Sequence, residues 1–402
     1  MPRDSETLDK SLGLLDVYAL ATGATLSAGF FILPGLAAQQ AGPALVLAYL
    51  LAAVPLVPAI LSKVELMTAM PRSGGIYFFL DRSLGPAAGT IGGVGTWLTL
   101  LLKVSFALVG MGAYLDLFLP QVNIVPVAVG LAVAIGAVNL VGAKITGKMQ
   151  IGLLAVVLTV LIGFMGMGVP RIEAANFHDF FGEGAESLVA TTGLVYVSYA
   201  GLTKIAGVAE EVREPEKNLP LGVFLSLVTA LAVYGVGTAV IVGVVPMGEL
   251  QGSLTSAAEA AQAIGGRWAM VAVSIAALLA FTAVTNAGTM SASRYPLAMS
   301  RDSVLPRGLQ KLNDRGIPAR SVVLTVATMI LVIVLFDPMK IAKLASAFKL
   351  FVFALVCLSV VVMRESRIEE YDPGYRTPFY PWLQIVGILS ALVLISTMGW
   401  LA

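Results

Sequence analysis

Residues 12–35 read LGLLDVYALATGATLSAGFFILPG, an apolar stretch long enough to cross a membrane but interrupted by glycine, serine and proline. Residues 188–211, LVATTGLVYVSYAGLTKIAGVAEE, form a second such stretch with glycines and a polar Thr-Lys pair inside it. Lipid offers no hydrogen bonds, so non-helical backbone at this depth must be shielded by protein or by a water-filled cavity. Two interrupted spans at corresponding places in two halves indicate the substrate site of a secondary transporter.

The composition is that of an integral membrane protein. Hydrophobic residues make up 58% of the chain and charged residues 12%, against about a quarter charged in soluble proteins. The net charge of +1 gives no indication of nucleic-acid binding. The single cysteine, Cys357, lies in an apolar segment and excludes a disulfide within the chain. The polar N-terminus leads directly into a full-length span, so we expect no cleavable signal peptide.

Apolar runs of about 20 residues predict an all-α protein with eleven transmembrane helices. We expect these helices at residues 13–35, 43–69, 88–119, 124–142, 147–169, 184–208, 219–246, 268–299, 320–336, 340–363 and 380–401. The sequence ends with the eleventh span, and the odd count predicts that a twelfth helix is absent from it.

Lysines and arginines predict the orientation. With residues 1–12 as a cytoplasmic N-terminus, seventeen of them fall on the inner side and four, Arg171, Arg267, Lys340 and Lys343, on the outer side. This asymmetry follows the positive-inside rule and predicts a multi-pass protein of the cytoplasmic membrane.

The first ten helices divide into two sets of five, residues 13–169 and 184–363, with the eleventh at 380–402 outside them. The interrupted spans then open each set. An odd number of helices per set places the two sets in opposite orientations, so the sequence predicts an inverted repeat.

The two interruptions predict a receptor made mostly of main chain. Unwinding around Thr25–Gly29 exposes backbone N–H groups at the start of the outer half-helix, where the positive end of the dipole favours a carboxylate. Unwinding around Val197–Gly201 frees carbonyl groups that can accept hydrogen bonds from an amine. The alternative is that these small residues serve only close helix packing.

Five stretches carry motifs of a known family: SAGFFILPG (27–35), KVELMTAMPRSGGIYFFLDRSLGP (63–86), YAGLTKIAGVAEEVREPEKNLPLGV (199–223), ASRYPLAMSRDSVLP (292–306) and YRTPFYPWLQIVG (375–387). Together they resemble the amino acid–polyamine–organocation (APC) superfamily, here an amino acid permease, over nearly the whole chain. The resemblance implies the five-plus-five inverted repeat of the bacterial leucine transporter, with broken helices 1 and 6 and usually twelve helices.

The resemblance also implies a set of substrate-binding residues. The carboxylate-binding turn falls on Ser27, Ala28 and Gly29, and the Thr25 carbonyl faces the substrate amine. In the sixth helix, the amine-binding carbonyls fall on Val197, Ser198 and Ala200.

The chain departs from the family pattern at two positions. Val197 occupies the place of a common aromatic gate, so the neighbouring Tyr196 or Tyr199 is expected to substitute for it. Thr203 replaces an acidic residue that is common after the sixth-helix glycine.

Two lysines inside spans are candidate specificity residues. Lys103 lies near the middle of the third span, where an ammonium group must face the bundle interior, pair with an anion or lose its proton. It would repel cationic substrates. Alternatively, it pairs with Glu65 or Asp116 or extends to the interface. Lys204 is either a fixed charge near the site or a partner of Glu210 or Glu211.

Four residues of the eighth span are candidates for ion coupling. Thr282, Thr285, Asn286 and Thr289, with Ser293, are spaced along one helical face. Sodium-coupled members of the fold use hydroxyls of this helix. The alternative is that the hydroxyls bond to their own helix or a neighbouring one. Val157 stands where some proton-coupled relatives carry a lysine.

We therefore expect a secondary amino acid transporter, symporter or antiporter, that works by alternating access and takes neutral or acidic rather than cationic substrates. Its partners would be the amino acid, a proton or sodium ion, and the lipid bilayer. We expect no enzyme activity, no cofactor and no metal site, and the oligomeric state is not predicted. The alternatives are an inorganic cation carrier on the same fold and a transport-inactive sensor or partner subunit.

Overall fold

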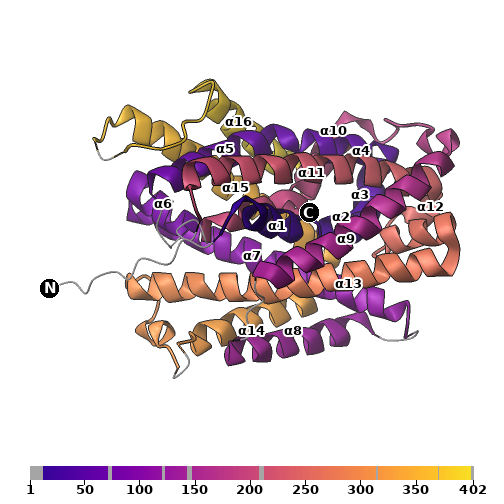
Figure 1. Ribbon diagram of the computed structural model, residues 1–402, viewed down its shortest axis with the longest axis horizontal. Coiled ribbons are helices and arrows are strands. Elements are labelled where there is room, and N and C mark those ends of the chain that lie inside the picture. The colour runs from indigo at the N-terminus through magenta and orange to yellow at the C-terminus, as the bar shows by residue number, and fades with distance from the viewer. Residues whose placement is uncertain are drawn as a thin grey trace.

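The computed structural model describes residues 12–70, 75–119, 123–142, 147–207, 212–313, 316–369 and 371–399, without the side chains of 147, 148 and 203–207 (Figure 1). Within these ranges the secondary structure is helical, apart from one isolated bridge between Leu12 and Val212. The helices are α1 (Leu14–Thr25), α2 (Ala28–Phe31), α3 (Leu33–Ala41), α4 (Leu45–Leu51), α5 (Ala53–Ala69), α6 (Gly75–Leu84), α7 (Pro86–Asp116), α8 (Ile124–Val141), α9 (Gly147–Gly168), α10 (Gly184–Val195), α11 (Pro215–Val244), α12 (Met247–Leu250), α13 (Ser256–Arg301), α14 (Ala319–Leu335), α15 (Pro338–Glu365) and α16 (Trp382–Thr397). The 3₁₀ helices are η1 (Gly42–Ala44), η2 (Val169–Arg171), η3 (Ala174–Phe177), η4 (Tyr196–Gly207) and η6 (Arg307–Gln310).

The predicted leucine-transporter-like fold with broken first and sixth spans is confirmed. The first span consists of α1, α2 and α3, and the helix is lost at Leu26 and Ser27, where Ser27 has φ −149° and ψ −134°. The sixth span begins as α10 and continues from Tyr196 as the 3₁₀ helix η4. Both breaks fall inside apolar segments, as the glycine and serine pattern predicted.

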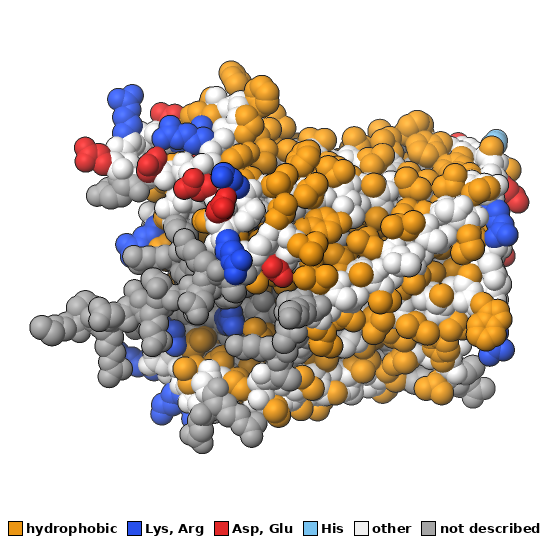
Figure 2. All heavy atoms as spheres, viewed as in Figure 1, with side chains coloured by type: hydrophobic (Ala, Val, Ile, Leu, Met, Phe, Trp, Pro, Cys, Tyr) orange, Lys and Arg blue, Asp and Glu red, His pale blue; other side chains and the backbone are white. Residues whose placement is uncertain are grey.

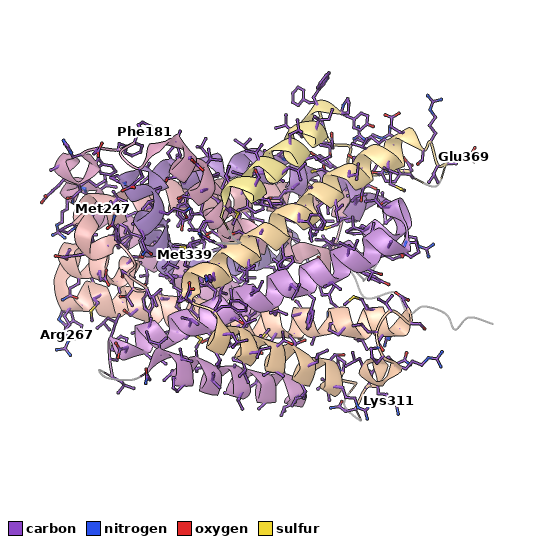
Figure 3. All side chains as sticks on the ribbon, turned by 180° about the vertical axis from the view of Figure 1, so that it is seen from behind. Phe181, Met247, Arg267, Lys311, Met339 and Glu369 are labelled. Atoms are coloured by element: carbon purple, nitrogen blue, oxygen red, sulfur yellow. The ribbon has the colours of Figure 1, made fainter. Side chains whose placement is uncertain are left out.

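A wide apolar surface covers the face of the bundle seen in Figure 2. Figure 2 shows hydrophobic side chains over the middle of the molecule and charged side chains gathered toward its two ends. Within the described residues, seven helical segments are long and apolar enough to cross a membrane, and α1, α14 and α16 are shorter apolar helices. Figure 3 places Arg267 at the end opposite Lys311 and Glu369, as expected for a chain that spans a bilayer.

Three helical segments outside the membrane spans were not predicted. The helix α6 follows the second span, and the short helix α12 follows the seventh. The helix α13 begins at Ser256, twelve residues before the predicted 268, because an outer segment joins it through a kink. The kink is at Gly266, whose φ of +68° suits glycine, which has no Cβ.

The broken first span lies at the centre of the bundle. Helix α1 packs against α11, η4 and α9, and α13 packs against α7 and α9. Helices α8 and α14 lie side by side at one edge (Figure 1). Aromatic rings fill the space beside α2, where Phe31 makes edge contacts with Tyr114 and Phe281. This packing supplies the shielding that broken backbone needs inside a membrane.

A buried carboxylate at the end of α5 organises the connection between α15 and α16. Glu65 is 0% exposed, and both its oxygens accept hydrogen bonds from Arg364, each at 2.7 Å. The hydroxyl of Tyr371 and the backbone N–H of Thr377 also donate to it, at 2.9 and 2.8 Å. Glu65 therefore pairs with Arg364, which corrects the alternative that it pairs with Lys103.

Candidate functional site

The break in the first span leaves polar groups at the start of α2. The backbone N–H groups of Phe30 and Phe31 both donate to the carbonyl of Ser27, at 2.9 and 3.2 Å. The preceding N–H groups, of Ala28 and Gly29, are at the start of α2, where backbone N–H groups have no acceptor within the helix. The Ser27 hydroxyl is fully buried and has no hydrogen-bond partner among the described residues. This turn can therefore donate hydrogen bonds to a bound group.

The break in the sixth span is held from α15. At the point where α10 ends, the backbone N–H of Val197 donates to the hydroxyl of Ser346 at 3.0 Å. That hydroxyl in turn donates to the carbonyl of Leu194 at 2.6 Å. Ser346 thus provides hydrogen-bond partners for the N–H of Val197 and the carbonyl of Leu194, where the chain changes from α to 3₁₀ geometry. Sequence reasoning missed Ser346, because a buried serine in an apolar helix carries no special signal.

The two breaks pack directly against each other through glycine. A Cβ atom placed on Gly29 would lie 2.5 Å from the Cβ and Oγ atoms of Ser198. A Cβ on Gly201 would lie 2.2 Å from the carbonyl carbon and oxygen of Ala24. Only glycine permits this approach of backbone to backbone. The structure thereby brings together the predicted residues Thr25 to Gly29 and Val197 to Gly201.

Two buried tyrosines, Tyr49 and Tyr234, bond to the main chain of the breaks, and a third, Tyr199, bonds to the main chain of α4. The hydroxyl of Tyr49 on α4 donates to the carbonyl of Gly29 at 2.6 Å. The hydroxyl of Tyr234 on α11 lies 2.8 Å from the carbonyl oxygen of Thr25 and 3.2 Å from that of Ser198. The hydroxyl of Tyr199 donates to the carbonyl of Tyr49 at 2.8 Å. Sequence reasoning had not singled out Tyr49 or Tyr234.

Lys103 reaches the first break from α7. Its ammonium group donates to the carbonyl of Ala24 at 3.0 Å, and the side chain is buried. That carbonyl belongs to the last turn of α1, where the negative end of the helix dipole favours a cation. Lys103 therefore faces the bundle interior. Its acceptor, Ala24, is the residue before Thr25, whose carbonyl is predicted to bind the substrate amine.

The residues predicted as gates take different positions. Tyr196 packs edge-on against Phe353 of α15, and its buried hydroxyl has no hydrogen-bond partner among the described residues. Tyr199 points toward α4, where it bonds to Tyr49. The backbones of Thr203 and Lys204 lie in η4, but their side chains lie outside the described part of the chain, as do Glu210 and Glu211.

The candidate ion-coupling residues of α13 bond within their own helix or toward α8. Thr282, Thr285 and Thr289 donate to the carbonyls of Leu278, Thr282 and Thr285. Asn286 accepts a hydrogen bond from Asn139 of α8 at 2.9 Å. The structure does not bring these four side chains together around the first break.

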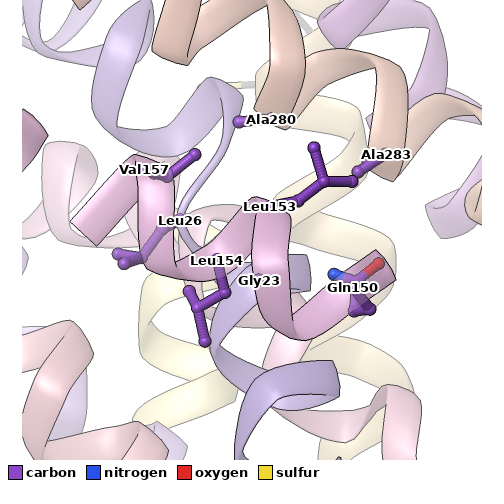
Figure 4. Close-up of a pocket in the computed structure, with 8 residues that line it drawn as sticks. All are labelled: Gly23, Leu26, Gln150, Leu153, Leu154, Val157, Ala280 and Ala283. Carbon is purple, nitrogen blue, oxygen red and sulfur yellow. The ribbon is translucent and has the colours of Figure 1, made fainter. Parts of the chain in front are cut away.

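A small pocket instead lies where α1, α9 and α13 meet (Figure 4). It is lined by Gly23, Leu26, Gln150, Leu153, Leu154, Val157, Ala280 and Ala283. The cavity of about 10 Å³ has room for about one water molecule. Its lining is apolar except for the Gln150 amide, and Ala280 and Ala283 are the residues that α13 contributes to it.

In comparisons with known proteins, nearly the whole chain matches one family. A profile of the family described as amino acid permease matches residues 12–402. The chain is similar to the branched-chain amino acid permease BcaP of Lactococcus lactis subsp. cremoris (strain MG1363), with 30% identity covering 94% of this chain and 87% of the relative. It is 28% identical to BcaP of Bacillus subtilis (strain 168), covering 98% of this chain and 89% of the relative.

A third relative carries a different name. The methylthioribose transporter of Bacillus subtilis (strain 168) is 24% identical, covering 96% of this chain and 87% of the relative. All three similarities cover more than nine tenths of this chain.

Proposed function

Because the chain belongs to the amino acid permease family of the APC superfamily, we propose that it carries amino acids across the cytoplasmic membrane by alternating access. The observation that carries this proposal is the meeting of two interrupted spans inside the bundle. Such a meeting presents main-chain donors at Ser27–Gly29 and main-chain acceptors at Thr25 and Ser198. A zwitterion needs both kinds of group, and this arrangement supplies them without a charged side chain.

We assign the substrate carboxylate to Ser27, Ala28 and Gly29, and the substrate amine to the carbonyls of Thr25, Val197, Ser198 and Ala200. The Ser27 hydroxyl, which has no hydrogen-bond partner within the described part of the chain, supports the first assignment, since a buried hydroxyl without a partner is costly. Tyr196 lies at the break, and its hydroxyl also lacks a partner among the residues that the structure describes, which favours it over Tyr199 as the substitute for the missing aromatic gate.

We propose that the substrate is neutral or acidic, and the names of the two BcaP relatives favour a branched-chain side chain. The Lys103 ammonium, bonded to the Ala24 carbonyl, supports this proposal because it adds a positive charge beside the amine site. A cationic side chain would be repelled there, whereas an apolar one would not. We propose that Lys204, whose backbone lies in η4, adds a second positive charge near the site.

We propose that the coupling ion is a proton or sodium, and the hydrogen bonds of α13 bear on the choice between them. The hydroxyls of Thr282, Thr285 and Thr289 already have acceptors in α13, and Asn286 bonds to Asn139. This occupation favours proton coupling or exchange over a sodium ion bound by these residues. The N-terminus is proposed to be cytoplasmic, and residues 13–169 and 184–363 are proposed as the two inverted repeats.

Uptake into proteoliposomes tests the proposal. We expect unlabelled leucine in excess to abolish uptake of labelled leucine, and potassium chloride to leave it unchanged. Potassium flux that no amino acid inhibits would favour the alternative of an inorganic cation carrier. Leucine binding without counterflow would favour a transport-inactive sensor or partner subunit.

Charge selection is tested on the same vesicles with two variants of one residue. Lys103→Glu reverses the charge near the break, and Lys103→Gln removes it. We expect inhibition of leucine uptake by lysine to strengthen about tenfold or more in Lys103→Glu, with Lys103→Gln in between. Equal inhibition by acidic and basic amino acids in all three proteins would contradict a role of Lys103 in selection.

A further inference from the structure

The hydroxyl of Tyr234 joins two main-chain acceptors that belong to different broken spans. It lies 2.8 Å from the carbonyl oxygen of Thr25, at the end of α1, and 3.2 Å from that of Ser198, in η4. These residues are far apart in the sequence, yet both oxygens lie within reach of one donor. The geometry therefore defines a single point at which a hydrogen-bond donor can bind both spans.

The ring of Tyr234 is held in place by the two other tyrosines of the site. Its centroid lies 5.1 Å from that of Tyr49 and 4.9 Å from that of Tyr199, and the side chain is 0% exposed. The three rings come from α4, η4 and α11, and two of the hydroxyls bond to the main chain of the first span. A ring packed this closely cannot move its hydroxyl freely. The position of the two carbonyl oxygens is thus fixed by a rigid side chain.

The two carbonyl oxygens can accept more hydrogen bonds than one phenolic hydroxyl can donate. A phenol has a single proton to donate, whereas each carbonyl oxygen has two lone pairs. An ammonium group has three protons and can bond to both oxygens at once beside the tyrosine. The separation that lets one hydroxyl oxygen approach both carbonyls also suits one ammonium nitrogen, because N–H···O and O–H···O bonds have similar lengths.

We propose that Tyr234 is a positioning residue for the substrate amine: its hydroxyl holds the carbonyls of Thr25 and Ser198 at the separation that one ammonium group bonds jointly. This proposal rests on the proposed amino acid transport and names a residue that acts through main-chain groups. It predicts that loss of the hydroxyl weakens recognition of the amine in particular, while the carboxylate turn at Ser27–Gly29 keeps its geometry.

The test compares two ligands on purified full-length protein. One ligand is leucine, and the other is its 2-hydroxy acid analogue, in which a hydroxyl replaces the amine. Tyr234→Phe removes one oxygen atom and keeps the ring. We expect the preference for leucine over the hydroxy acid, measured as a ratio of dissociation constants, to fall about tenfold in Tyr234→Phe. A purely structural role would weaken both ligands equally and leave the ratio unchanged, which would overturn the proposal.

Tyr114→Phe is the matched control. Its hydroxyl donates to the carbonyl of Phe31 at 2.9 Å from an equally buried ring, but that carbonyl lies outside the amine site. We expect its ratio to equal that of the wild type. A Tyr234→Phe protein that fails to fold, judged by gel filtration and thermal unfolding without ligand, would also overturn the positioning role. Wild-type protein that binds neither ligand would overturn this proposal and the proposed function together.

Discussion

At the scale of single residues, the contact between the two breaks depends on glycines, which have no side chain. Gly29 and Gly201 let the two breaks meet, and each would collide with main chain or with Ser198 if it carried a Cβ atom. Gly29 makes the contact between the proposed carboxylate turn and η4. A methyl group there must push η4 away from α2, which changes the spacing of every group in the proposed site.

We therefore expect Gly29→Ala to lower leucine uptake by about a hundredfold, since displacements of about 1 Å at a site have effects of that size. Uptake is measured in proteoliposomes with equal amounts of inserted protein. Gly163→Ala is the control, because no heavy atom lies within 4 Å of a Cβ at that position of α9. Wild-type uptake by Gly29→Ala would contradict the placement of the site.

Sequence reasoning identified the breaks but not the side chains that hold them. Glycine and serine in an apolar span are visible signals, and they located Ser27, Gly29 and Gly201. Tyr49 and Tyr234 bond to backbone carbonyls, and a backbone acceptor has no signature in the sequence. Lys103 was visible as a charge, but its contact with the Ala24 carbonyl required knowledge of how α7 packs on α1.

At the scale of elements, the end of α5 is fastened to the segment that follows α15. The carboxylate of Glu65 binds Arg364, Tyr371 and Thr377, and the guanidinium group of Arg364 also lies over the ring of Tyr380. These residues come from the end of α5, from the last turn of α15 and from the connection between α15 and α16. One buried anion thereby fixes the entry of α16 into the bundle.

Glu65→Gln should destabilise the protein strongly, because it leaves the partly buried Arg364 guanidinium, whose side chain is 19% exposed, without its carboxylate. Breaking such a pair costs about 3–5 kcal/mol. A thermal unfolding scan in detergent should show a clearly lower midpoint. Glu214→Gln is the control, since Glu214 pairs with Lys217 on the surface and such pairs contribute about 0–1 kcal/mol. Equal midpoints for the two variants would show that the Glu65 pair does not hold this connection.

The elements themselves were predicted unevenly, for a physical reason. Long apolar spans such as α7 and α15 must fit the bilayer thickness, so composition and length were enough to place them within a few residues. The helices α6 and α12 and the outer part of α13 are short or amphipathic and do not need to cross lipid. Their boundaries depend on packing and on the turn at Gly266, which apolar content does not reveal.

At the scale of the whole molecule, the charge distribution predicts the orientation in the membrane. Arg267 lies at one end of the bundle and Lys311 at the other (Figure 3), and the surface between the ends is apolar (Figure 2). The predicted excess of lysine and arginine on the inner side would place Lys311 in the cytoplasm. The fold alone does not distinguish the two orientations, and the excess of lysine and arginine is the basis for predicting a cytoplasmic N-terminus.

Single cysteines test this orientation. We expect Arg267→Cys to react with a membrane-impermeant maleimide in intact cells, and Lys311→Cys to react only after permeabilisation. The wild-type protein is the control, because its single cysteine, Cys357, is 0% exposed and should not react. The opposite pattern of labelling would place the N-terminus outside the cell.

The contacts between the two breaks also bear on how such a protein can change over time. The tyrosine hydroxyls and the Lys103 ammonium grip peptide oxygens, and an oxygen of this kind is present whatever amino acid carries it. Mutation at Val197 or Ala200 can therefore change side chains of the proposed site while these hydrogen bonds to the main chain stay intact. Proteins held together in this way can change their substrate preference by mutation without first losing their fold.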